Sequence, residues 1–374
     1  MPGRPGSAHP LTPRETNYVR TSGSGDTSVV NATVHVADRD TPAGGQHGAA
    51  PTPPSTRIMT LPTLPPGHNY KELTSPEDVR KAKNFIEHEY GSPMSFTYPS
   101  TTKFFGITGS DGNIKAAGEI NRFSWHTSEI RHVVVGNGSR GVGLGRGLLT
   151  YLESKTESPL AMLVSKLPQI KRVMDTNGYN EVSNARGSSG DNLATYIKTL
   201  DPSSEHASLS TQSTNHVATG RPESPAVGTG RFQEVHSSTA KTFIETQYGA
   251  QGLYKFPETS TFHALKSSSG ETTVAVGEVN KVGWYMSEVK HLTVMGEYRH
   301  MGFGQKTLQH IETQVPSSAA MFASKTPQMK LIAKARGFQE ISSVKGPSGK
   351  NVSIYVKTLI PSSDYSGPGS NRRP

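Results

Sequence analysis

The second half of the chain repeats the first. Residues 118–200 align without a gap to residues 277–359 at an offset of 159, and 32 of these 83 positions are identical. Upstream the offset is 158, so the copies differ by one residue near Ser110-Asp111-Gly112, a turn sequence that suits a hairpin. Solenoid repeats run to only about 20 to 50 residues. The duplication therefore predicts two whole domains of one fold in tandem.

Composition places flexible segments around these domains. Only 32% of the 374 residues are hydrophobic, which is low for a chain that is globular throughout. Residues 1–66 are rich in Gly, Pro, Ser and Thr and show no periodicity, so we expect a flexible or disordered N-terminal arm. We expect the first domain over 67–201, a flexible linker over 202–230, the second domain over 231–364 and a disordered tail over 365–374.

Each copy mixes helical and strand patterns. Helix 76–90 has apolar residues at helical spacing and a Ser-x-x-Asp cap beginning at Ser75. The pattern predicts further helices at 148–155 and 169–176, and strands at 102–107, 114–120, 128–135, 160–165 and 195–200. The expected fold class is mixed α/β (α+β), with a mixed central sheet flanked by helices in each domain.

Charge and cysteine content remove several classes of function. The net charge of +9 is spread thinly, with no dense basic run, so it does not predict nucleic-acid binding. There is no cysteine, which excludes disulfides, thiolate metal sites and a Cys nucleophile, and we expect no metal site. No apolar run reaches about 18 residues and no signal peptide is recognisable, so we expect a cytoplasmic protein without a membrane partner.

A strand runs into a glycine turn and then a helix in both copies. In the first, Val135 precedes Arg140-Gly141-Val142-Gly143-Leu144-Gly145; in the second, Val294 precedes Arg299-His300-Met301-Gly302-Phe303-Gly304. Unpaired amides at a helix start bind phosphate when glycines let it approach. The spacing fits neither Gly-x-Gly-x-x-Gly nor a P-loop. The turn predicts a phosphate site, and the alternative is a glycine-rich surface loop without a ligand.

The run from Ser287 to Gly304 resembles the central motif of the GNAT superfamily of N-acetyltransferases, in which a strand ending in Val leads to an Arg/Gln-x-x-Gly-x-Gly/Ala turn. Gly178-Tyr179 and Gly337-Phe338 resemble the family's Gly-Phe pair, and Gly118-Glu119 and Gly277-Glu278 fall where the family has a Gly before its third strand. The similarity covers roughly two thirds of the chain, and it predicts two tandem GNAT-like domains.

The resemblance implies acetyl-CoA as co-substrate, held by a splayed strand and the turn, with an amine attacking the thioester directly. The backbone of Val135 and Val294 would pair with the pantetheine arm. Turn amides would hold the pyrophosphate, and the residues that supply them are Arg140, Gly141, Gly143, Gly145 and Arg146 in the first copy and Arg299, Gly302, Gly304 and Gln305 in the second.

Amine acetylation needs a general base. The family often places a Glu on or near its fourth strand, which points to Glu129 and Glu288; the alternative is that both are solvated carboxylates at a strand end. His132 and His291, three residues on, are the second candidates, and their alternative is a packing role within the sheet. All four side chains are candidate catalytic residues.

Other positions depart from the family pattern or differ between the copies. A Tyr that often serves as the general acid is replaced by Met174 and Ala333. Trp125 and Trp284 suit either the core or a wall of the acceptor pocket. The residues after them, His126 and Tyr285, differ as acceptor-facing residues would.

Two functions follow as hypotheses. The first is an acetyl-CoA-dependent N-acetyltransferase whose acceptor is an amine-bearing small molecule or peptide. The second is a catalytically inactive duplicated GNAT-like fold that serves as a structural or interaction module, for example as a virion component. GNAT domains often pair through their sheets, so we expect either pairing of the two domains within one chain or a homo-oligomer.

Overall fold

The computed structural model describes residues 29–34, 57–91, 98–166, 170–186, 192–201, 230–248, 256–283, 285–299, 301–346 and 349–359. Nearly all of the predicted linker and the whole predicted tail lie outside these residues. The predicted arm contains two antiparallel strands, β1 (Val29–Val34) and β2 (Arg57–Pro62). Leu61 is buried in the core of the first domain. Packing of that domain therefore begins before residue 67.

The first domain is built on one mixed seven-stranded sheet in the order β3-β4-β5-β6-β7-β9-β8. Only β6 and β7 are parallel; the other neighbours are antiparallel. The strands are β3 (Asn69–Leu73), β4 (Thr102–Thr108), β5 (Ile114–Arg122), β6 (Thr127–Val135), β7 (Leu160–Ser165), β8 (Asn180–Arg186) and β9 (Asn192–Thr199).

The second domain repeats this sheet as β10-β11-β12-β13-β14-β16-β15, with β13 and β14 parallel. Its strands are β10 (Phe232–Glu234), β11 (Ser260–Lys266), β12 (Thr273–Lys281), β13 (Ser287–Val294), β14 (Ala319–Ser324), β15 (Gln339–Lys345) and β16 (Asn351–Thr358). The two tandem mixed α/β domains predicted from the repeat are confirmed.

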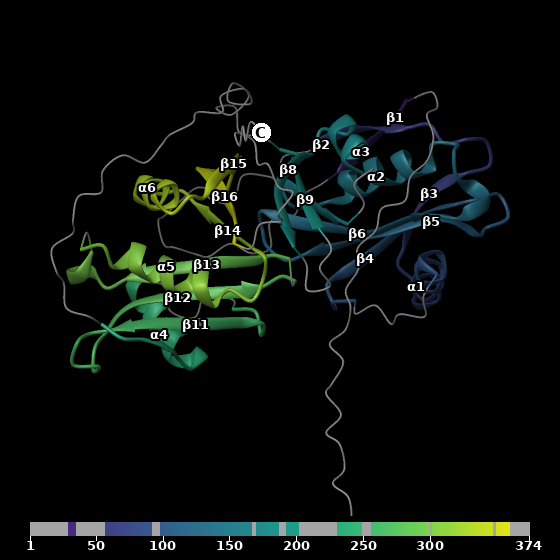
Figure 1. The fold of residues 1–374 in the computed structure, drawn as a ribbon. Coiled ribbons are helices and arrows are strands. Elements are labelled where there is room, and N and C mark those ends of the chain that lie inside the picture. Colours follow the sequence, from purple (N-terminus) through teal and green to yellow (C-terminus); the bar gives the residue numbers. More distant parts are fainter. Residues whose placement is uncertain are drawn as a thin grey trace, which may run out of the picture.

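Helices cover both faces of each sheet (Figure 1). They are α1 (Pro76–Tyr90), α2 (Leu144–Lys155) and α3 (Ile170–Thr176), then α4 (Ser237–Tyr248), α5 (Phe303–Gln314) and α6 (Pro327–Ala335). The predicted cap is present, because the Asp78 amide donates to Ser75 Oγ at 3.1 Å, and Gly91 ends α1 in the left-handed region at φ 68°. Within the described residues no helix is long and apolar enough to cross a membrane.

Alternation along the strands separates two cores in each domain. Ala117 and Val134 face α1, together with Ile86. Their neighbours Ala116 and Val133 face α2 on the other side of the sheet. Because successive strand residues point to opposite faces, β5 and β6 are buried on both sides.

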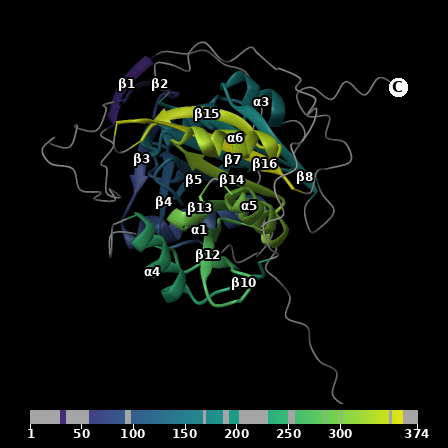
Figure 2. The same cartoon turned by 90° about the vertical axis from the view of Figure 1, so that its left-hand side faces the viewer.

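The domains pack through the β7–β9–β8 half of one sheet and the β14–β16–β15 half of the other (Figures 1 and 2). Leu160, Met162 and Val164 of β7 join Met321 of β14 in one shared apolar cluster. Residues between them, such as Leu163, face the first domain's own core. Intramolecular domain pairing through the sheets is therefore present.

Reciprocal hydrogen bonds relate the two halves of this interface. Ser183 Oγ and Thr358 Oγ1 are 2.7 Å apart, and so are Thr199 Oγ1 and Ser342 Oγ. Ser183 and Ser342 are equivalent at the offset of 159, as are Thr199 and Thr358. Each contact thus occurs twice with the domains exchanged, as in an isologous dimer interface. The tandem pair reproduces a two-fold dimer within one chain.

One predicted helix boundary is wrong, and one strand in each domain was missed. Helix α2 begins at Leu144, not at 148, because Gly143 at φ 86° turns the chain directly into the helix. Strand β8 and its equivalent β15 were not predicted, since most of their residues are polar and the two buried apolar residues of β8, Val182 and Ala185, are three positions apart and give no alternating pattern.

Candidate functional site

The parallel strands at the centre of each sheet separate after a short ladder. β6 pairs with β7 over Thr127–Glu129, and β13 pairs with β14 over Ser287 and Glu288. Yet β6 continues to Val135 and β13 to Val294. Backbone groups beyond such a ladder can pair with an extended ligand. The splayed strand implied by the GNAT resemblance is present in both domains.

Each splayed strand carries a β-bulge at its histidine. In the first domain the register shifts between Ala117 and Glu119, and His132 lies at φ 47°. In the second domain the corresponding shift lies between Gly277 and Val279. A non-glycine residue adopts such a φ infrequently, and bulges re-aim side chains next to functional sites. The bulge sets the direction of the histidine where the strands part.

A buried glutamate on the neighbouring strand holds each histidine. His132 Nδ1 is 2.6 Å from Glu119 Oε1, and His291 Nδ1 is 2.5 Å from Glu278 Oε2. Ser260 Oγ also donates to Glu278 at 2.5 Å. The sequence singled out both histidines but gave neither glutamate a catalytic role; the signal available was a Glu repeated in both copies at a position that alternation predicts to be buried. The structure thus forms two His–Glu pairs.

Aromatic rings surround both histidines, and the two histidine side chains differ in how far they are buried. Tyr90 and Tyr98 contact His132, whose side chain is 0% exposed. Tyr248 and Phe256 contact His291, whose side chain is 16% exposed. Burial and the charge of Glu119 raise the pKa of Tyr98 well above its usual value. The first pair is fully buried, whereas the histidine of the second pair is partly exposed to solvent.

The predicted catalytic glutamates lie in the domain interface. The Tyr285 hydroxyl donates to Glu129 Oε1, and His126 Nε2 donates to Glu288 Oε1 at 3.0 Å. Glu129 is 0% and Glu288 3% exposed. The alternative of a solvated carboxylate is therefore wrong, and so is the expectation that His126 and Tyr285 face an acceptor. Both residues contact the opposite domain's glutamate.

Charge stabilises these buried carboxylates. Burial alone would raise the pKa of Glu288, but the hydrogen bond and charge of His126, together with Lys290, outweigh it and hold that pKa below its usual value. In the first domain Arg131 Nε lies 3.6 Å from Glu119 and 3.7 Å from Glu129. A polar chain therefore runs from the first domain's His–Glu pair to the interface.

Trp125 also lies at this interface. Its ring is partly buried against the apolar cluster that the domains share. This packing agrees with a core role for Trp125, while Trp284 lies outside the described residues. The positions of the missing acid, Met174 and Ala333, are fully buried in the two cores.

The glycine turns have the form expected of a helix-start anion site. A short 3-10 turn, Asn137–Ser139 in the first domain, leads to Gly143 at φ 86°; in the second, Gly296–Tyr298 leads to Gly302 at φ 80°. A Cβ built on Gly143 or Gly302 would meet no atom within 4 Å. Backbone conformation, not crowding, therefore requires glycine at both positions.

The arginines before these turns fold back onto the strand end. Arg140 Nε donates to Val135 O at 3.0 Å, and Arg299 Nε donates to Val294 O at 3.3 Å. Arg140 Nη2 also donates to Glu89 Oε2 at 2.9 Å. Arg299 is exposed. The two copies thus share one contact and differ in the other.

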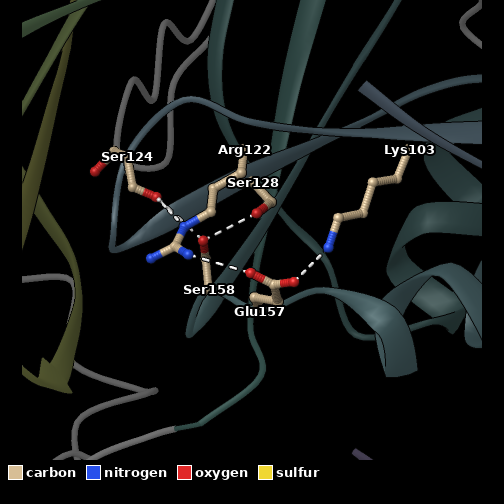
Figure 3. Close-up of polar contacts among 6 residues, drawn as sticks. All are labelled: Lys103, Arg122, Ser124, Ser128, Glu157 and Ser158. Carbon is tan, nitrogen blue, oxygen red and sulfur yellow. Dashed lines mark hydrogen bonds and ion pairs between the residues drawn. The ribbon is translucent and has the colours of Figure 1, made fainter. Parts of the chain in front are cut away.

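A polar cluster fixes the paired end of the splayed strands in the first domain (Figure 3). Glu157 accepts from Lys103 at 2.5 Å and from Arg122 at 3.2 Å, while Ser158 and Ser128 are 2.9 Å apart. The contacts join the loop after α2 to the start of β6. They hold the strands together at the end opposite to the glycine turn.

The described residues contain no group of three or more His, Cys, Asp or Glu side chains arranged to hold a metal ion. The chemistry available is a His–Glu pair, a splayed strand and a glycine turn preceded by an arginine in each domain.

Comparisons with known proteins give structural likenesses only. No family model matches the chain, and no curated protein does. Aminoglycoside 6'-acetyltransferase type Ii superposes with 14% identity and a TM-score of 0.31, over 35% of this chain and 99% of that one. The ribosomal-protein-S18-alanine N-acetyltransferase of Escherichia coli superposes with 12% identity and a TM-score of 0.31, over 36% of this chain and 97% of that one. A GNAT family acetyltransferase of Elizabethkingia anophelis with acetyl-CoA bound superposes with 7% identity and a TM-score of 0.30, over 34% of this chain and 97% of that one.

Such scores do not support any inference about activity. The fold rests on the strand order, the single parallel pair that splays, and the left-handed glycine before α2 and α5. On these features the chain contains two tandem domains with a GNAT-like fold.

Proposed function

We propose that this chain is an acetyl-CoA-dependent N-acetyltransferase and that the second domain carries out the chemistry. The observation that carries the proposal is the His291–Glu278 pair, which lies where β13 leaves β14 and is partly open to solvent. His291 sits on β13, which ends at Val294 and leads to the glycine turn, and Glu278 sits on the neighbouring β12. The proposed base, His291, is therefore followed along the chain by the extended backbone of β13 and then by the anion site at the glycine turn.

His291 is the proposed general base. Donation from Nδ1–H to Glu278 selects the tautomer whose lone pair is on Nε2, the form that accepts a proton. Tyr248 and Phe256 contact the ring and limit the water around it. His291 would take the proton of the attacking ammonium, and Glu278 would orient the ring and stabilise the imidazolium.

The residues of the second turn fit acetyl-CoA. Arg299 is exposed, the space above Gly302 is empty, and the amides at the start of α5 point out of the helix. Bound acetyl-CoA would supply the acetyl thioester, and the acetyl group would pass to the amine nitrogen as the CoA thiol leaves.

Glu288 is less suited to act as the base. Its carboxylate accepts a hydrogen bond from His126 of the first domain, is 3% exposed, and has a lowered pKa. A base needs access to the proton that it removes. The contacts support an interface role for Glu288 and leave His291 as the better candidate.

The test begins with calorimetric titration of the intact protein with acetyl-CoA. Thiol release is then followed with a panel of primary amines that includes a polyamine, an aminoglycoside and a peptide with a free N-terminus. His291→Gln should lower kcat by about 10²- to 10⁴-fold with little change in acetyl-CoA affinity. His236→Gln, at an exposed histidine at the start of α4, is the control and should keep wild-type kcat.

Absence of acetyl-CoA binding by the wild-type protein would refute the proposed function. Binding with unchanged kcat in folded His291→Gln would keep the enzyme but remove His291 as its base. Glu278→Gln should lower kcat and shift the pH-rate profile, because it removes the charge that stabilises the imidazolium.

A further inference from the structure

The two glycine turns are not equivalent, and the difference lies in the helix that precedes them. Arg140 donates to Glu89 Oε2 at 2.9 Å and to Val135 O at 3.0 Å. The Glu89 side chain is only 7% exposed. Hydrogen bonds between ionised groups at this distance are strong, and poor hydration strengthens this one. Arg140 is thus held by two partners and its charge is neutralised.

The second copy lacks this acidic partner. The offset of 158 that aligns α1 with α4 places Gln247 at the position of Glu89. Among the residues described in the second domain, no carboxylate lies within 4 Å of Arg299, and its bond to Val294 O is longer, at 3.3 Å. Arg299 keeps its full charge and is exposed.

We infer that Glu89 closes the first glycine turn to CoA, so that the chain binds one CoA molecule, in the second domain. This inference rests on the proposed function and assigns a role to a residue outside the turn. A carboxylate beside the turn repels a diphosphate and competes for the arginine that would contact it. Complete burial of His132 beneath Tyr90 and Tyr98 closes the adjoining site as well.

Because the domain is duplicated, the two copies can have different roles. The first domain supplies part of the shared apolar cluster and the His126 contact to Glu288, whether or not it binds CoA. Its turn is therefore free to lose the ligand while its fold is retained. One domain supports the structure and the other carries the site.

The experiment is calorimetric titration of the full chain with CoA. The wild type should bind one CoA per chain, and Gly302→Asp should abolish the heat. Glu89→Gln, which copies the second domain's residue into the first, should give a second site. Gln247→Glu, the reverse exchange, should weaken the remaining site at least tenfold, about 1.4 kcal/mol. Circular dichroism and melting temperature establish that each variant is folded.

Glu77→Gln controls for the loss of one negative charge from α1. Glu77 is 12 residues from Glu89, about 18 Å along the helix, and is exposed in an ion pair with Lys81. This variant should bind one CoA with wild-type affinity.

Two CoA molecules per wild-type chain, or a folded Glu89→Gln variant that still binds one, would overturn the inference while leaving the enzyme proposal in place. No binding by wild type would instead refute the proposed function itself. The two failures are therefore distinguishable in one titration series.

Discussion

The contact between Tyr285 and Glu129 gives a quantitative test of the domain interface. Tyr285 is 2% exposed and Glu129 0% exposed, and the hydroxyl donates to the carboxylate. Tyr285→Phe removes this donor and leaves the ring in place. A hydrogen bond to a charged group contributes about 1.5 to 3 kcal/mol, and a buried carboxylate that loses its donor is destabilised by a similar amount. We expect the free energy of unfolding to fall by about 2 kcal/mol.

Urea unfolding of Tyr285→Phe, Glu129→Gln and the double variant measures the coupling between the two side chains. Each single change should lower the unfolding midpoint, and the double variant should lose clearly less than the sum, with a coupling of about 1.5 kcal/mol or more. Because the hydrogen bond joins the two domains, both domains should be destabilised together and unfold in a single transition. A coupling below about 0.5 kcal/mol, or two separate transitions of which only one shifts, would refute the reasoning.

Three further outcomes follow. Burial lowers the pKa values of both His263 and His310. The charge of the His310 ring lowers the pKa of His263 further, and Glu234 opposes this only weakly. The folded state therefore binds these protons more weakly than the unfolded state, so stability that is complete above pH 6.5 should decline as the pH falls below it. Urea unfolding midpoints at pH 7.5 and 5.5 measure this loss of stability. His310→Tyr, which introduces the residue found at the aligned position 151, should make the difference between the two midpoints smaller. Gly302→Ala should cost about 1 to 2 kcal/mol of stability, measured by urea unfolding, because the obstacle is the positive φ and not space. Glu288→Gln should lower the melting temperature without lowering kcat, and a large loss of kcat in the folded variant would reassign the base to Glu288.

Local pattern sufficed for much of the fold. The helical spacing and cap at Ser75 predicted α1, and Ser75 does accept from the Asp78 amide. The glycine cluster predicted a turn that leads from a strand into a helix, and Gly143 and Gly302 form this turn. These features depend on residues within a few positions of one another, so the sequence encodes them directly.

The candidate site was only partly predictable. His132 and His291 were identified, but their glutamate partners lie 13 positions earlier on a neighbouring strand, and only the register of the sheet brings them together. The bulge that re-aims the histidine depends on that register too. Strand pairing across a hairpin therefore decided which carboxylate became the histidine's partner.

By itself the sequence determined that there are two similar domains, the order of most of their elements, and a glycine turn with a charged rim. Only the tertiary structure decided what Glu129 and Glu288 do. Their partners, Tyr285 and His126, lie 156 and 162 residues away and reach them because the two sheets pack against each other. Burial depends on the surface that covers a residue, and when another domain supplies that surface, no local pattern records it.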